Sequence, residues 1–204
     1  MARVTAEKAL ETKEGLLDAA RQVLHRDGFA GLSTRRVAAV ADAPMSQIQY
    51  HFGSKEGLLV AVFEDMNAQL LERQQLMFSD DTTSLATKWD LACDYLDDDL
   101  ASGYVSVLQE LLAAGWTNAE VGSVVRAGLH GWAELLSDVV RQAADAGMPL
   151  GPFDPDDIAA LVATVFIGAE AFLLLGMEDD GTPVRQALRR IGSAIQVWEE
   201  GGGR

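Results

Sequence analysis

The sequence predicts an all-α protein with two parts, a small N-terminal part of three helices and a larger helical C-terminal part. Three observations predict this fold class. Apolar residues recur every three or four residues along most of the chain, whereas the alternation typical of strands is almost absent. Residues that favour helix caps precede several of these segments. The apolar fraction is 49% over 204 residues, which is typical of a soluble globular protein.

Three helices are predicted within residues 1–53. An apolar stripe that ends at Leu24 predicts the first helix, and Gly28 in "RDG" suits a left-handed residue at its C-terminal end. Ser33 is placed to cap a short helix in "LSTRRVAAV". The segment "ADAP" interrupts the helical spacing before "MSQIQYH" resumes it. Asp42 lies in that turn, where a positive φ is expected and Asp is tolerated better than most residues.

The C-terminal part is predicted to begin with a longer helix from Ser54. Later helix starts carry capping residues, namely Thr117 with Glu120, Asp154 with Pro155, and Thr182 with Pro183. Helices are therefore predicted near residues 84–101, 104–116, 118–146, 155–176 and 183–199. These elements divide the chain into a helix-turn-helix domain at 1–53, a second domain at 54–200 and a flexible tail at 201–204.

The net charge of −15 is distributed unevenly along the chain. Residues 1–60 contain 8 Lys and Arg against 7 Asp and Glu, a net charge of +1, whereas residues 61–204 contain 8 against 24, a net charge of −16. A near-neutral N-terminal part is able to approach a phosphate backbone while the acidic body is held away from it. The charge alone is equally compatible with an ordinary acidic protein.

The sequence favours a cytoplasmic protein that does not enter a membrane. The start "MARVTAEKALETKEG" contains no apolar signal segment. The longest apolar stretch, "IAALVATVFIGAEAFLLLG", includes Glu170 and lacks basic flanks, so it predicts a buried helix rather than a membrane span. The lone Cys93 cannot form an internal disulfide, and it is expected to be a small core residue in a reducing compartment.

The two short helices joined by a turn predict a helix-turn-helix, in which the first helix supports the second. Apolar contacts between them are expected from Val37, Ala38, Ala41, Ala43 and Ile48. The second helix then exposes Ser46, Gln47, Gln49 and Tyr50, which are side chains able to reach base edges or phosphates. His51 and Lys55 are placed where the backbone phosphates would pass. This pattern predicts binding to double-stranded DNA.

The stretch "GFAGLSTRRVAAVADAPMSQIQYHFGSKEGLL" resembles the DNA-binding domain of TetR-family transcriptional regulators, and the resemblance covers residues 12 to about 60. It implies a homodimeric, ligand-responsive regulator, favoured as a repressor released from a palindromic operator by its effector. Three departures from the family pattern, Asp42, Pro44 and Gln49, affect the expected base preference. The DNA-binding residues implied together by the pattern and the resemblance are Thr34, Arg35, Arg36, Met45, Ser46, Gln47, Gln49, Tyr50, His51 and Lys55.

Two other classes of function were weighed against the same residues. An enzyme is disfavoured because the chain lacks the common nucleophile, phosphate-loop and zinc motifs, and no cofactor or metal is expected. The run Asp97-Asp98-Asp99 lacks the spacing of a calcium loop and is expected to face water. A helix-turn-helix adaptor that binds only proteins is disfavoured by Arg35, Arg36 and Lys55, because a protein interface needs no phosphate-spaced basic rim.

Dimerisation and effector binding are predicted for the C-terminal domain. The segment 158–176 is apolar on two faces, which predicts one face against the core and one against a partner subunit, with helix 118–146 completing a four-helix arrangement. The dimer residues selected are Ile167, Gly168, Ala171 and Leu174. Aromatic and flexible residues on apolar stripes predict a pocket for an apolar small molecule, neutral or cationic because the body is acidic. The residues selected for it are Phe63, Met66, Trp89, Trp116, His130, Phe166 and Glu170.

Overall fold

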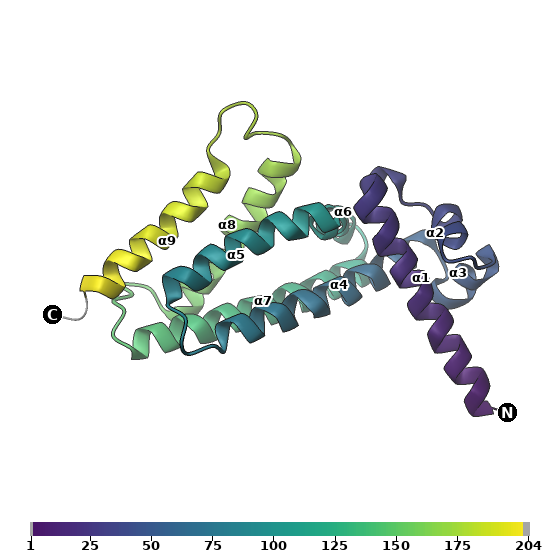
Figure 1. Cartoon of the computed structure of the whole chain (residues 1–204), viewed down its shortest axis with the longest axis horizontal. Coiled ribbons are helices and arrows are strands. Elements are labelled where there is room, and N and C mark those ends of the chain that lie inside the picture. The colour runs from purple at the N-terminus through teal and green to yellow at the C-terminus, as the bar shows by residue number, and fades with distance from the viewer. Residues whose placement is uncertain (1, 202–204) are drawn as a thin grey trace. The chain divides into compact units, whose positions relative to one another are not determined.

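A computed structural model describes the backbone of residues 2–201 and the side chains of residues 7–201. Across this range the protein is built from nine helices without a strand (Figure 1). The helices are α1 (Ala2–Gly31), α2 (Thr34–Val40), α3 (Met45–Phe52), α4 (Lys55–Phe78), α5 (Leu85–Ser102), α6 (Tyr104–Gly115), α7 (Ala119–Asp145), α8 (Pro155–Leu174) and α9 (Val184–Gly201). The all-α prediction is confirmed, and each predicted helix has a counterpart within a few residues.

Several predicted caps are confirmed by the hydrogen bonds at helix starts. The Ser33 hydroxyl accepts a hydrogen bond from the Arg36 amide at 3.3 Å and so begins α2. At the start of α8, Pro155 is the first helical residue, and the Asp157 carboxylate accepts from the Asp154 amide at 3.1 Å. These bonds satisfy amide groups that have no partner within the helix.

The predicted cap at Thr117 is wrong, because α7 is capped by the next residue. The Asn118 Oδ1 atom accepts hydrogen bonds from the amides of Glu120 at 3.0 Å and Val121 at 3.3 Å. The Thr117 hydroxyl instead donates to the Ala114 carbonyl at 3.3 Å, at the end of α6. The hydroxyl is therefore occupied in closing one helix and does not open the next.

Two backbone positions take the unusual conformations expected of them. Gly28 has a φ of 67° and breaks the helical geometry near the end of α1, in a region that a side chain would make unfavourable. Asp42, in the turn between α2 and α3, has a φ of 49°. Asp tolerates this left-handed conformation better than most residues, which explains how the turn forms without glycine.

The chain forms two compact units. The first contains the described residues up to Ala68 together with Ala101–Val125, and the second contains Gln69–Leu100 and the described residues from Arg126 onward. Helices α1, α2, α3 and α6 thus belong to the first unit, whereas α5, α8 and α9 belong to the second apart from the last residues of α5. The core of the first unit is formed by Leu16, Leu24, Val37, Ile48, Leu58, Val62, Phe63, Val105, Leu108 and Leu111.

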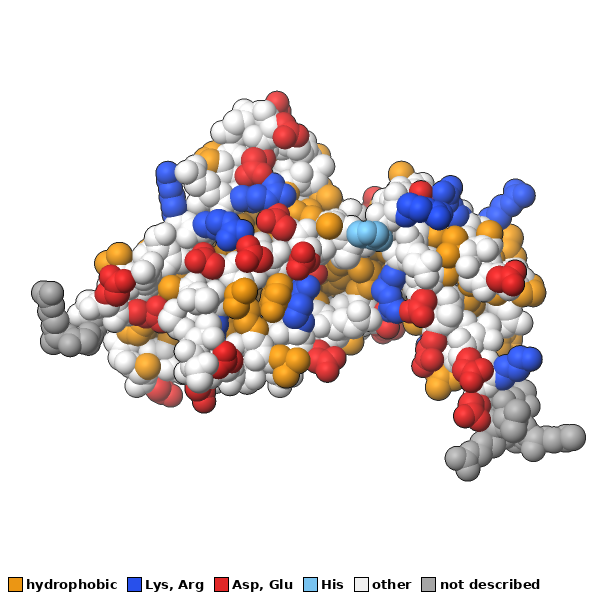
Figure 2. Space-filling model, viewed as in Figure 1, with side chains coloured by type: hydrophobic (Ala, Val, Ile, Leu, Met, Phe, Trp, Pro, Cys, Tyr) orange, Lys and Arg blue, Asp and Glu red, His pale blue; other side chains and the backbone are white. Residues whose placement is uncertain are grey.

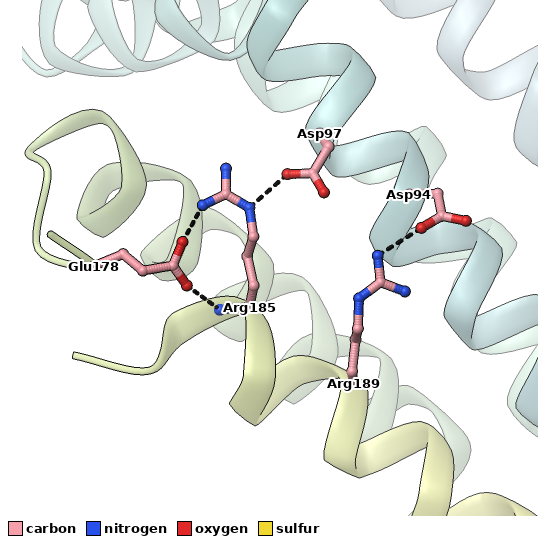
Figure 3. Close-up of polar contacts among 5 residues, drawn as sticks. All are labelled: Asp94, Asp97, Glu178, Arg185 and Arg189. Atoms are coloured by element: carbon pink, nitrogen blue, oxygen red, sulfur yellow. Dashed lines mark hydrogen bonds and ion pairs between the residues drawn. The ribbon is translucent and has the colours of Figure 1, made fainter. Parts of the chain in front are cut away.

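In the second unit, α9 is attached to α5 by ion pairs (Figure 3) and by a hydrogen bond from a tryptophan. Arg185 contacts Glu178 and donates from Nε to Asp97 Oδ1 at 2.6 Å, and Arg189 donates to Asp94 at 2.5 Å. These side chains are partly exposed, so the pairs orient α9 more than they stabilise it. The indole of Trp89 donates to the Leu188 carbonyl at 2.8 Å.

The acidic run Asp97-Asp98-Asp99 of α5 was expected to face water, but two of its three carboxylates are paired with arginines. Asp98 faces water as predicted, but Asp97 pairs with Arg185, and Asp99 accepts two hydrogen bonds from Arg73 at 3.0 and 2.8 Å. Burial raises the pKa of Asp99, and the nearby Arg73 opposes that rise. The run lies in the C-terminal part of α5, three to five residues before Ser102, and its first and third carboxylates meet arginines of neighbouring helices.

Candidate nucleic-acid interface

Helix α3 is held on α2 by a small apolar contact. Val37 and Ile48 are buried, Ala38 lies between the helices, and the Ala43 amide donates to the Ala38 carbonyl at 2.9 Å across the turn. Ala41 and Ala43 are only partly buried. Pro44 precedes α3 without a side-chain cap, in keeping with the departure noted in the sequence. The predicted packing of the helix-turn-helix is thus present.

The opposite face of α3 is exposed and polar. Met45, Ser46, Gln49 and Tyr50 all lie on the surface, and Tyr50 is 74% exposed. Their spacing of one and four residues places them on one side of the helix. Gln47 is half-buried at the edge of this face. The structure therefore brings together the five residues selected on α3 for contact with bases, on a helix with no covering element in its own unit.

Basic residues lie beside this face at the start of α2. Arg35 is exposed and makes no hydrogen bond or ion pair with any residue that the structure describes. Arg36 is paired with Asp27 at 2.8 Å. A hydrogen bond from Arg26 lowers the pKa of Asp27, and Arg36 adds to this effect, so Asp27 stays ionised and neutralises part of the positive charge. Thr34 is half-buried in the first turn.

The predicted phosphate contacts follow at the end of α3 and the start of α4. His51 lies edge-on to Tyr50 with ring centroids 4.9 Å apart, and its Nε2 atom is buried without a hydrogen-bond partner among the described residues. Lys55 is exposed as the first residue of α4, with Nζ 5.7 Å from the centre of the Phe29 ring. In Figure 2, Lys and Arg side chains gather at the end of this unit that carries α2.

Gly57 is a functional position that the sequence interpretation missed. Ser54 caps α4 by accepting from the Gly57 amide at 2.9 Å. A Cβ atom on Gly57 would lie 2.0 Å from the Phe52 carbonyl oxygen, which is far inside contact distance. Only glycine therefore lets α4 start directly against the last turn of α3. The second glycine of "GSKEG" is visible in the sequence, but the need for glycine there becomes clear only from the close approach of α3 and α4.

We expect Gly57→Ala to destabilise the protein by about 1–3 kcal/mol, because the new methyl group must push α3 away from α4. DNA binding should weaken further than the loss of folded protein explains, since α3 would be displaced. Thermal unfolding and a DNA titration measure the two effects. Gly15→Ala, at an exposed position of α1 with open space for a Cβ, is the matched control and should keep or raise the melting temperature. Equal behaviour of the two variants would contradict this account.

The residues selected for effector binding are not all gathered in one place. Phe63 and Met66 lie in the core of the first unit, where Phe63 stacks on Tyr104 at a centroid distance of 6.0 Å. Trp89 and Phe166 belong to the second unit and meet edge-on at 5.6 Å. Phe166 also meets the ring of Trp132 on α7 edge-on, with ring centroids 5.9 Å apart.

The remaining selected residues have different surroundings. Glu170 is buried in the second unit, and His130 is exposed on α7. Trp116 follows the last residue of α6 and is 83% exposed. Cys93 is buried as expected, and burial raises its pKa to about 11. Within residues 7–201, no three His, Cys, Asp or Glu side chains are arranged to hold a metal ion.

A groove of about 400 Å³ runs between α7 and α8 in the second unit. It is the nearest feature to the predicted pocket, because it includes His130 and the ring of Trp132. Its other lining residues are Arg126, Leu129, Ala133, Ala160, Ala163, Thr164 and Ile167. The groove is open to the surface, so it differs from the enclosed aromatic cavity that the sequence suggested.

Helix α8 exposes a continuous apolar stripe. The stripe, here called the α8 stripe, consists of Leu161, Val165, Gly168, Phe172 and Leu175, spaced alternately four and three residues apart. Of the four residues selected for the dimer, Gly168 lies in this stripe, Ile167 lines the groove, Ala171 is half-buried and Leu174 is exposed. The opposite side of the helix is buried through Ala159, Phe166 and Ala169.

Two further observations concern these last helices. On α9, the exposed residues Ile191 and Val197 extend the apolar surface beyond the helices chosen from the sequence. Among the described residues, α8 is the one helix long and apolar enough to cross a membrane, a test that core helices of soluble proteins also pass.

Comparison with known proteins gives matches of two kinds. Residues 16–62 match the model of "Bacterial regulatory proteins, tetR family". The HTH-type transcriptional regulator CymR of Pseudomonas putida is 33% identical over 103 residues, which cover 48% of this chain and 51% of that protein. The first relatives are thus matched over about half of their length or less.

Other matches span nearly the whole chain at lower identity. The HTH-type transcriptional regulatory protein RaaS of Mycobacterium tuberculosis is 26% identical over 195 residues, covering 90% of this chain and 83% of that protein. A regulator from Saccharomonospora viridis, solved in complex with choline, superimposes with a TM-score of 0.71 at 15% identity, covering 93% and 96% of the two chains. Together with the helix-turn-helix geometry, these matches identify residues 16–62 as a DNA-binding domain of the tetR-family type, in a chain whose overall fold is similar to that of such regulators.

Proposed function

We propose that this protein is a homodimeric transcriptional repressor that binds an inverted-repeat operator and is released from it by a small-molecule effector. The observation that carries the proposal is the exposed polar face of α3, which packs on α2 in the same unit as the exposed residues Arg35 and Lys55. A face of this kind reads base edges in the major groove, while the basic residues contact phosphates.

The α8 stripe supports the dimer. Its four large side chains are each between 45% and 76% exposed in the single chain, and Ile191 and Val197 expose more apolar surface on the adjacent α9. Contiguous exposed apolar surface marks interaction sites. A second copy would cover it by placing its own α8 and α9 on the same surface, which gives a two-fold axis. The protein would then carry two copies of α3, suited to an inverted repeat.

The effector is supported by the second unit. Its groove between α7 and α8 lies within the size range of small-molecule sites, and one aromatic ring, that of Trp132, lines it. The similar regulator from Saccharomonospora viridis was solved with choline, so a protein of this fold is able to hold a small molecule. An effector that binds one conformation of the protein more tightly than another would then change the fraction of protein molecules that fit the operator.

Selection of bound DNA from a random duplex pool tests the proposal. We expect an inverted repeat with half-sites about one helical turn apart, or roughly 34–36 Å. Repeating the selection with a metabolite library should identify compounds that release the DNA. Sequence-indifferent binding, or no binding at all, would instead favour a protein-binding adaptor.

Two substitutions should separate contacts to bases from contacts to phosphates. Lys55→Ala should weaken binding to every duplex alike, because one phosphate contact is lost. The slope of the logarithm of the binding constant against the logarithm of the salt concentration should fall in magnitude by about 1. Gln47→Ala should cost roughly 1–3 kcal/mol on the selected site only. Salt titrations on selected and random duplexes measure both effects. Equal losses on the two duplexes for Gln47→Ala would remove this residue from base readout.

A further inference from the structure

The α7–α8 groove combines an apolar floor with very few free hydrogen-bond donors. The floor is aliphatic, and the indole of Trp132 is fixed beside it because its Nε1 atom donates to Gln74 Oε1 at 2.8 Å. The hydroxyl of Thr164 donates to the Ala160 carbonyl at 2.8 Å. Both of these donors are therefore already used inside the protein.

Two lining side chains remain able to donate to a bound molecule, Arg126 and His130. They stand four residues apart on α7, which places them one above the other on the same side of the helix. Neither makes a hydrogen bond or ion pair with any residue in the described part of the chain. Arg126 is always charged at physiological pH, and its fork of N–H groups matches a carboxylate or sulfonate.

The two ends of the groove differ in charge, with Arg126 at one end and carboxylates beyond the other. Beyond His130 the groove continues into a second hollow, lined by Glu134, Asp138 and Asp156, in which Arg141 pairs with both aspartates at 2.5 and 2.9 Å. That end is acidic despite Arg141, so it repels an anion. A ligand with one negative group would therefore place that group at Arg126 and its apolar body on the floor beside Trp132.

We propose that the α7–α8 groove binds a small organic monoanion with a flat apolar body, and that Arg126 and His130 hold its acidic group. The proposal rests on the effector-responsive function proposed above and assigns the effector's chemical class. This ligand class differs from the neutral or cationic ligand that the net charge favours. The guanidinium of Arg126 acts on a bound anion at contact distance, whereas the distant carboxylates are screened by solvent. The remaining lining residues supply apolar contact and shape.

Matched probes that differ only in charge test the assignment. Binding of 2-naphthoate and of its neutral analogue 2-naphthamide is measured by calorimetry and by the quenching of tryptophan fluorescence. The full-length protein should bind the acid at least about tenfold more tightly than the amide, as expected for a charge-assisted hydrogen bond that only the acid accepts. Arg126→Gln should remove this preference. Arg190→Gln, which removes the same charge from an exposed position of α9, should retain it.

Three outcomes would overturn the assignment. The first is equal affinity for the acid and the amide, or no measurable binding of the acid. The second is an unchanged preference in Arg126→Gln. The third is a loss of dimer in Arg126→Gln but not in Arg190→Gln, measured by sedimentation, because it would show that a second copy of the chain occupies the groove.

A DNA-binding assay in parallel distinguishes failure of the site from failure of the proposed function. If the acid binds through Arg126 but leaves affinity for the selected operator unchanged, the groove assignment stands and the effector role fails. If the acid releases operator equally from the unmodified protein and from Arg126→Gln, regulation stands and the groove assignment fails.

Discussion

Gly168→Arg should convert the protein to monomers and lower its operator affinity by about 100-fold or more. Gly168 lies at the centre of the α8 stripe, and no atom lies within 4 Å of the position of its Cβ, so arginine fits in the single chain. At a two-fold interface, however, each subunit would bury a guanidinium against apolar residues without a partner, which is strongly unfavourable. The affinity falls because a monomer binds one half-site at a time. Linking two binding modules in one dimer raises the affinity by a factor of about 10²–10⁴.

Sedimentation and a titration of the selected DNA measure these two effects. Gly168→Ala is the matched control, since a methyl group adds apolar surface and no charge, and it should remain dimeric. Ile167→Glu should also dissociate the dimer, but Ile167 lines the α7–α8 groove and would disturb ligand binding as well. A Gly168→Arg protein that stays dimeric would show that another surface forms the interface.

Phe63→Ala should destabilise the protein by about 3–5 kcal/mol, which is a large part of the stability of a typical domain. The Phe63 side chain is 1% exposed in the first unit, and its ring stacks on Tyr104. The Tyr104 hydroxyl in turn donates to Asn67 Oδ1 at 2.9 Å, so the ring lies beside a buried polar pair. Removal of the ring would leave a cavity in a fully packed region.

Thermal and denaturant unfolding measure this loss, with Trp116→Ala as the control. Trp116 is another aromatic residue selected from the sequence for effector binding, but it lies on the surface, so its removal should change stability by no more than about 0.5 kcal/mol. If Phe63 is instead the wall of an effector pocket, Phe63→Ala would fold with near-normal stability and lose its response to the effector. That result would reject the core assignment.

Local patterns were enough to predict most of the fold. Helix formation depends on neighbouring residues, so the apolar spacing along α4 and α8 and the caps at Ser33 and Asp154 could be recognised directly. The start of α7 could not be predicted in this way, because the adjacent side chains of Thr117 and Asn118 were both able to cap it. The choice was made by the end of α6, which uses the Thr117 hydroxyl.

The α3 face was predictable for the same local reason. Once Val37 and Ile48 are assigned to the contact between α2 and α3, the helical period alone decides that Gln49 and Tyr50 point outward. Gly57 was missed because a glycine in a helix looks like any other until the carbonyl oxygen of Phe52 is known to lie against it.

Aromatic residues in the C-terminal part show where sequence patterns stop being informative. Phe63, Trp89 and Trp116 were all assigned to apolar helical stripes. Phe63 is buried in one unit, Trp89 donates a hydrogen bond to α9 in the other, and Trp116 is exposed. Periodicity identifies which side of a helix is apolar, but it does not identify what packs there.

The sequence by itself determined the helices, their order and the polar face of α3, because these follow from interactions within a few residues. Tertiary structure alone decided which apolar faces meet inside the chain and which remain open as the α8 stripe. It also decided that Arg126 and His130 stand beside the α7–α8 groove without a polar partner among residues 7–201. Those outcomes depend on the crossing of helices distant in the chain, where side-chain shape selects one partner among many apolar alternatives.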